Sequence, residues 1–71
     1  MRIQELPGIG VRYDIDSGSA GKSVSVVIRN SGGRDLYVFE SAGEEPTATL
    51  ELNEVTARKI GAVLAGLYFT G

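Results

Sequence analysis

The chain has 71 residues and a net charge of −2, and it contains neither cysteine nor histidine. Its length fits one small domain. Without cysteine, a disulfide framework or a thiolate metal site is excluded, and the composition fits a reducing cytoplasm. Without histidine, the commonest metal ligand and the usual proton carrier near neutral pH are missing. The acidic balance disfavours a surface that binds nucleic-acid phosphates.

The sequence shows neither a predicted membrane span nor a secretory signal. No apolar run approaches the roughly 20 residues that a membrane span requires. The first five residues lack the apolar core of a secretory signal. We therefore expect a cytoplasmic chain that does not insert into a membrane.

The first predicted strand, Arg2–Glu5, leads into a bend over Leu6–Gly10. Pro7 fixes its own φ, while Gly8 and Gly10 can adopt backbone angles that other residues avoid. We expect a positive φ at Gly8. The bend also carries two apolar side chains that we expect to pack on a core or to contact a partner: Leu6 and Ile9.

Three further strands are predicted in the first half of the chain. Val11–Asp16 alternates apolar with charged residues, as a half-buried strand does. A glycine-rich loop over Ser17–Lys22 then leads to Ser23–Arg29 and Asp35–Glu40, which are rich in valine and aromatic residues. These two segments should form a hairpin because a short glycine-containing stretch joins them.

A loop over Ser31–Gly33 would pair Arg29 with Asp35 and so match opposite charges across the hairpin. The same register would place apolar residues opposite each other on one face: Ile28 with Leu36, and Val26 with Val38. The other face would carry an apolar group, which we expect something to cover and which we predict as a partner contact: Val27, Tyr37 and Phe39.

The last predicted elements are a strand and a helix. After a turn over Ser41–Pro46, Thr47–Leu52 alternates again as a fifth strand. Asn53 is a suitable N-cap for a helix over Glu54–Ala65, and Gly61 within it suggests a close approach to the sheet. The predicted fold class is therefore α+β, a small antiparallel sheet of about five strands with one C-terminal helix packed on it.

Two glycine motifs resemble nucleotide-binding loops but lack the required context. Gly21-Lys22-Ser23 matches the end of a P-loop, yet Asp16 stands at the first glycine position and a strand follows. Gly8-Ile9-Gly10 begins like a dinucleotide fingerprint, but Tyr13 occupies the third glycine position. Neither motif predicts a nucleotide site.

The paired carboxylates, Asp14 with Asp16 and Glu44 with Glu45, are interpreted as solvated surface, because a hard metal needs several oxygens that converge. The serines have no histidine available as a base. We therefore predict no catalytic residue, no cofactor and no metal ligand, and we expect that the chain is not an enzyme.

Beyond these local features, the whole chain resembles the amino-terminal domain of the regulatory subunit of bacterial cation/proton antiporters of the KhtT type. The resemblance is carried by Glu5–Gly10 followed by Val11–Tyr13, by Asp35–Phe39 after a Gly-Arg turn, and by Leu52–Arg58. It implies that residues 1–71 form a single non-catalytic regulatory module. Its partner would be a membrane antiporter subunit for potassium or another monovalent cation, and the module would lie at the inner face of the membrane through that partner.

In that family a second, carboxyl-terminal domain of the kind found in regulators of potassium conductance follows. It senses a nucleotide ligand, cyclic di-AMP in some members, and it is absent from this chain. The resemblance therefore implies a module that couples ligand sensing in a companion domain to transport, with a second copy of the chain as a further candidate partner. Two alternatives remain from the residues alone: a β-domain that stacks single-stranded nucleic acid on Tyr37 and Phe39, and a purely structural spacer.

Overall fold

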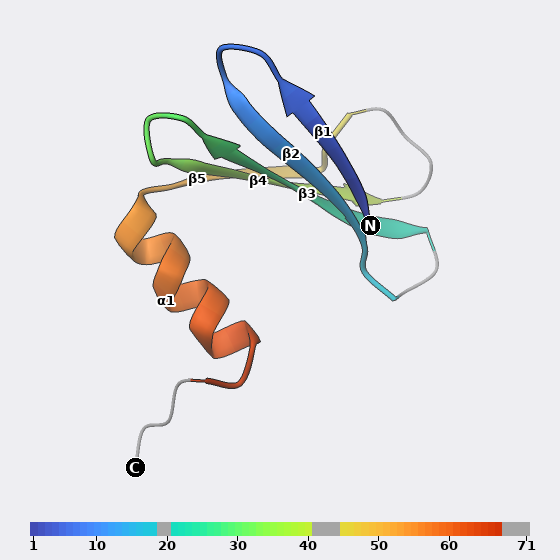
Figure 1. The fold of residues 1–71 in the computed structure, drawn as a ribbon. Helices are drawn as coiled ribbons and strands as arrows, with labels where there is room; N and C mark the ends of the chain where they lie inside the picture. The colour runs from blue at the N-terminus through green and yellow to red at the C-terminus, as the bar shows by residue number, and fades with distance from the viewer. Residues whose placement is uncertain (19–20, 41–44, 68–71) are drawn as a thin grey trace.

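The computed structural model describes residues 1–18, 21–40 and 45–67. Five strands form one antiparallel sheet in sequence order, and a helix follows the last strand (Figure 1). The elements are β1 (Arg2–Leu6), β2 (Gly10–Asp16), β3 (Lys22–Arg29), β4 (Arg34–Glu40), β5 (Ala48–Leu52) and α1 (Glu54–Leu64). The predicted α+β class, with five strands and one C-terminal helix, is confirmed.

The predicted boundaries agree with the observed ones to within one residue at each end. Residues 19–20 of the predicted loop at 17–22 and residues 41–44 of the predicted turn at 41–46, Glu44 included, lie outside the described residues.

The predicted register of the β3–β4 hairpin is wrong by two residues. The structure pairs Val26 with Leu36, Val24 with Val38 and Ile28 with Arg34. The loop consists of residues 30–32, because the Arg29 amide donates to the Gly33 carbonyl at 2.9 Å and the Gly32 amide donates to the Arg29 carbonyl at 2.9 Å. Of the two adjacent glycines, Gly32 takes the positive φ of 103° that closes a three-residue loop.

A shift of two residues leaves every side chain on its predicted face, because strand side chains alternate with a period of two. Apolar side chains on one face turn toward α1, and we call this the helix face: Val11, Tyr13, Val24, Val26, Ile28, Leu36, Val38, Leu50 and Leu52. The opposite face mixes charged and apolar residues: Arg12, Asp14, Ser25, Val27, Arg29, Asp35, Tyr37, Phe39 and Glu51.

Burial is concentrated on the opposite face of β3 and β4. Val27 is the buried hydrophobic residue of the described chain, at 6% exposure, and Ser25 and Asp35 are buried beside it. On the helix face, by contrast, Ile28 and Leu50 are exposed. The helix face is thus covered less completely than the face that carries the polar residues.

Helix α1 begins and ends as its sequence predicts. The Asn53 side chain accepts from the Thr56 amide at 2.8 Å, and Glu54 pairs with Arg58 at 2.6 Å. At the other end, the Gly66 amide donates to the Val63 carbonyl and the Leu67 amide donates to the Ala62 carbonyl, with Gly66 at φ 72°. These bonds form a Schellman motif, in which glycine satisfies the last carbonyls of a helix.

The helix slopes away from the end of β5 (Figure 1). No residue of α1 is buried. A Cβ atom at Gly61 would meet nothing within 4 Å, so the predicted close approach of the sheet to Gly61 is wrong. The helix and the sheet instead border an open groove.

Candidate functional site

The bend between β1 and β2 is a tight turn. The Ile9 amide donates to the Leu6 carbonyl at 3.0 Å, which closes a four-residue turn with Pro7 and Gly8 at its centre. Gly8 has a φ of 77°, as predicted. Proline followed by a glycine of positive φ is the pattern of a type II turn. The pattern of antiparallel strands around it confirms that Gly8-Ile9-Gly10 is not a dinucleotide-binding loop.

Gly10, at the end of the bend, lies directly against β3. A Cβ atom here would stand 1.9 Å from the carbonyl oxygen of Ile28, closer than any contact allows. The Asn30 amide also donates to the Ile9 carbonyl at 2.8 Å, which ties the bend to the β3–β4 loop. The bend is therefore a fixed corner of the sheet.

The five predicted contact residues fall into two groups. Val27, Tyr37 and Phe39 lie together on the opposite face of β3 and β4, but Val27 is buried while the two aromatic rings are half-buried. Leu6 and Ile9 lie at the bend, where Leu6 is half-buried and Ile9 is 49% exposed. Ile9 is therefore the exposed residue of the predicted surface, while Leu6, Tyr37 and Phe39 are partly exposed.

Next to the aromatic rings, the opposite face carries a hydrogen-bonded polar cluster. The Ser25 hydroxyl donates to Asp14 Oδ1 at 2.5 Å, and Arg12 Nε donates to the same oxygen at 2.8 Å. The hydrogen bond from Ser25 is the largest cause that lowers the pKa of Asp14 below its ordinary value, and the hydrogen bond from Arg12 is the next. Arg12 also donates to Ser25 at 3.3 Å. The prediction that Asp14 is solvated surface is therefore wrong, because its carboxylate accepts two hydrogen bonds from neighbouring side chains, whereas Asp16 is exposed as predicted.

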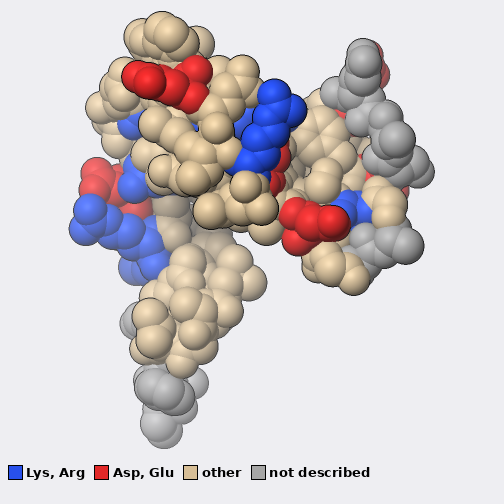
Figure 2. All heavy atoms as spheres, turned by 45° about the vertical axis from the view of Figure 1, so that its right-hand side comes forward, with Lys and Arg blue, Asp and Glu red and all other residues tan. Residues whose placement is uncertain are grey.

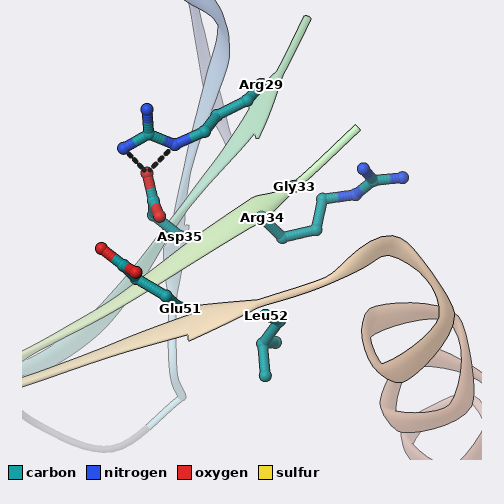
Figure 3. Close-up of a pocket in the computed structure, with 6 residues that line it drawn as sticks. All are labelled: Arg29, Gly33, Arg34, Asp35, Glu51 and Leu52. Atoms are coloured by element: carbon teal, nitrogen blue, oxygen red, sulfur yellow. Dashed lines mark hydrogen bonds and ion pairs between the residues drawn. The ribbon is translucent and has the colours of Figure 1, made fainter. Parts of the chain in front are cut away.

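A shallow charged hollow of about 280 Å³ lies near the β3–β4 loop. Arg29 donates to the buried Asp35 at 2.6 Å, and this contact raises the pKa of Arg29 above its ordinary value. Glu51 lies on the same side of the sheet as Asp35, whereas Arg34 extends away from this pair (Figure 3). The predicted pairing of Arg29 with Asp35 is therefore present as a diagonal contact, despite the shifted register.

Sequence reasoning did not predict the groove between α1 and the helix face. It has a volume of about 200 Å³ and is lined mainly by apolar side chains of both elements. Alternation and helical periodicity correctly identified the two apolar surfaces. They could not give the angle between the helix and the sheet, and that angle leaves the groove open.

Two further observations concern nucleotide and membrane sites. Lys22 begins strand β3, so the helix that a P-loop lysine must precede is not there. Within residues 1–18, 21–40 and 45–67, no helix is long and apolar enough to span a membrane.

Comparison with known proteins identifies the family. A family model described as "K(+)/H(+) antiporter subunit KhtT, N-terminal domain" matches residues 1–68. This chain belongs to the KhtT N-terminal domain family. The K(+)/H(+) antiporter subunit KhtT of Bacillus subtilis (strain 168) is 33% identical over 72 residues, and the protein YrvC of the same organism is 34% identical over 70 residues.

The two alignments cover 97% of this chain, but only 43% of KhtT and 42% of YrvC. The chain therefore spans less than half the length of the curated relatives that it matches. The predicted resemblance to the KhtT amino-terminal domain is confirmed, and it extends over nearly the whole chain. The family name connects the chain with a subunit of a potassium/proton antiporter.

Proposed function

We propose that this chain is a non-catalytic regulatory module of a potassium/proton antiporter, which it contacts at the inner face of the membrane. The observation that carries the proposal is the family match over residues 1–68. The described side chains support it, because the buried polar groups Ser25 and Asp35 both have protein partners. The module acts by binding a protein, without chemistry of its own.

The regulatory signal comes from a companion domain that senses a nucleotide such as cyclic di-AMP. Both relatives are more than twice as long as their matched part, which leaves room for such a domain. Ligand binding in the companion domain shifts the position of this module, and the shift biases transport because the antiporter binds one arrangement more tightly. Potassium is the cation that the family name supports.

The aromatic surface around Tyr37 and Phe39 is the proposed contact with the antiporter, with Ile9 and Leu6 at the bend as its second part. Tyr37 and Phe39 lie opposite Ser25 and Ser23 on β3, on the same face of the sheet as the buried Val27. Half-buried aromatic rings are frequent at the centres of protein interfaces. A second copy of the chain is the alternative partner for this surface.

The test replaces Tyr37 and Phe39 with serine in the complete subunit and measures binding to the antiporter in detergent. We expect binding to weaken by at least tenfold, since each buried aromatic anchor is worth 1 kcal/mol or more, roughly, at an interface. Tyr13→Ser is the matched control, because Tyr13 is half-buried on the helix face. Unchanged binding of a folded double variant would exclude this surface.

A further inference from the structure

The β3–β4 loop, residues 30–32, lies between the bend and the first turn of α1. Toward the bend, the Asn30 amide donates to the Ile9 carbonyl at 2.8 Å. Toward the helix, Glu54 Oε2 lies 3.2 Å from the position that a Cβ atom of Gly32 would occupy. The loop therefore adjoins two segments that are far apart in the sequence, at the same end of the sheet (Figure 1).

The bend holds Ile9 in place through both of its backbone polar groups. The Ile9 amide donates to the Leu6 carbonyl at 3.0 Å, and the Ile9 carbonyl accepts from Asn30. The side chain of Ile9 is nevertheless 49% exposed. A side chain on a backbone that is already fixed loses little conformational entropy when it binds a partner. Ile9 is therefore a preorganised anchor, and its position depends on the β3–β4 loop because that loop supplies one of the two bonds.

The first turn of α1 is the part of the helix that adjoins the loop. Glu54 Oε1 accepts from the Arg58 side chain at 2.6 Å, and the other carboxylate oxygen lies beside Gly32. Residues 60–67 carry no charge, and Figure 2 shows charged side chains over the sheet and beside the start of the helix. No residue of α1 is buried. Little packing along the helix therefore opposes a change in its angle, and such a change moves Glu54 relative to Gly32.

Gly32 can pass this movement on, because hydrogen bonds close the loop around it. The Gly32 amide donates to the Arg29 carbonyl at 2.9 Å, and the Gly32 carbonyl accepts from the Arg34 side chain. Each residue has only two soft backbone dihedral angles, so a short loop with bonded ends has little freedom to absorb a displacement at Gly32. The displacement therefore reaches the Asn30 amide, and with it the bond to Ile9.

We propose that the β3–β4 loop couples the angle of α1 to the position of Ile9, so that the helix and the bend change together. The inference rests on the proposed function, in which a companion domain shifts this module, and it names the route of that shift. Helix α1 is the last described element of a domain that the family model calls N-terminal, so a companion domain that follows it acts on α1 first. The loop then carries the change to the bend, which is part of the proposed antiporter contact.

Amide hydrogen exchange of this chain, measured by NMR, tests the coupling. Glu54→Ala removes the carboxylate beside Gly32 at an exposed position, and we expect the Asn30 amide to exchange roughly fivefold faster, because its bond to Ile9 is less well held. Glu54→Gln keeps a side chain of the same size beside Gly32 and should exchange as the wild type does. Arg58→Ala is the matched control, because it breaks the ion pair with Glu54 but leaves the carboxylate in place. It should not change the rate at Asn30. Circular dichroism verifies that each variant is folded.

The functional test uses membrane vesicles that contain the antiporter and the complete subunit. We expect Glu54→Ala to reduce the response of exchange to cyclic di-AMP by about half or more, while the subunit binds the antiporter as the wild type does without nucleotide. An Asn30 exchange rate that Glu54→Ala leaves unchanged would overturn the coupling, and so would a full nucleotide response of that variant. A full response of Glu54→Ala, together with a response that is lost when residues 1–67 are deleted, would overturn this route and leave the proposed function intact.

Discussion

Gly8 and Gly10 lie two residues apart in the bend, yet their backbones impose different requirements. Gly8 needs only a positive φ, because nothing lies within 4 Å of a Cβ there. Gly10 has no room for a side chain, because a Cβ would overlap the Ile28 carbonyl. The pattern Leu-Pro-Gly-Ile-Gly predicted the turn, but the contact at Gly10 depends on the position of β3 and could not be predicted from local sequence.

We therefore expect Gly8→Ala to lower the free energy of unfolding by about 1–2 kcal/mol, the cost of a left-handed conformation for an L-residue. Gly10→Ala should prevent folding or cost far more, because β2 and β3 would have to separate. Urea unfolding followed by circular dichroism measures both changes. A Gly10→Ala variant as stable as Gly8→Ala would contradict the contact between Gly10 and β3.

The Asp14 carboxylate gives a prediction for pH. Its pKa is lower in the folded chain than its ordinary 3.8, so its contribution to stability is complete above that value and is lost as the pH falls through the folded pKa. Ser25→Ala and Arg12→Met should each raise the pKa of Asp14, because each removes a hydrogen bond to the carboxylate.

NMR titration of the Asp14 carboxyl carbon in the two variants and in the wild type measures these shifts. An Asp14 pKa that Ser25→Ala leaves unchanged would show that the hydroxyl does not stabilise the carboxylate.

The ends of helix α1 could be predicted from the sequence, but its angle to the sheet could not. Asn53 and Gly66 define its ends through local hydrogen bonds, and both ends were predicted correctly. The angle at which α1 meets the sheet depends on packing between distant residues, and the groove was therefore not predicted. The β3–β4 register failed for a related reason, since Gly32 and Gly33 are both suited to the positive φ and sequence does not distinguish them.

A substitution at Gly61 tests the distance between α1 and the sheet. Because Cβ has open space there, Gly61→Ala should raise the free energy of unfolding by up to about 1 kcal/mol through its higher helix propensity. Thermal unfolding of the wild type and the variant at the same concentration measures this effect. A destabilised variant would indicate that the sheet approaches Gly61 closely after all.

At the scale of the whole molecule, the sheet is the part of the chain with buried residues, while the helix extends from it with none. A small domain with an uncovered apolar helix is suited to binding, because burial of that helix requires a partner. The aromatic surface and the helix groove lie on opposite faces of the sheet. The two apolar surfaces are therefore separate from each other.

The proposed regulatory role rests on the family match and on the exposed apolar surfaces of the described residues. The sequence predicted the family through the bend and the aromatic hairpin, whereas the contact residues could not be ranked without burial. Val27, for example, looked like a surface residue in the strand pattern and is in fact buried.

Potassium/proton exchange in inside-out membrane vesicles tests the regulatory role most directly. The vesicles contain the antiporter and the complete subunit, either intact or lacking residues 1–67, and exchange is recorded with and without cyclic di-AMP. We expect the deletion to abolish the effect of the nucleotide on exchange while the remaining subunit still binds the nucleotide. An equal nucleotide response with and without residues 1–67 would contradict a coupling role for this domain.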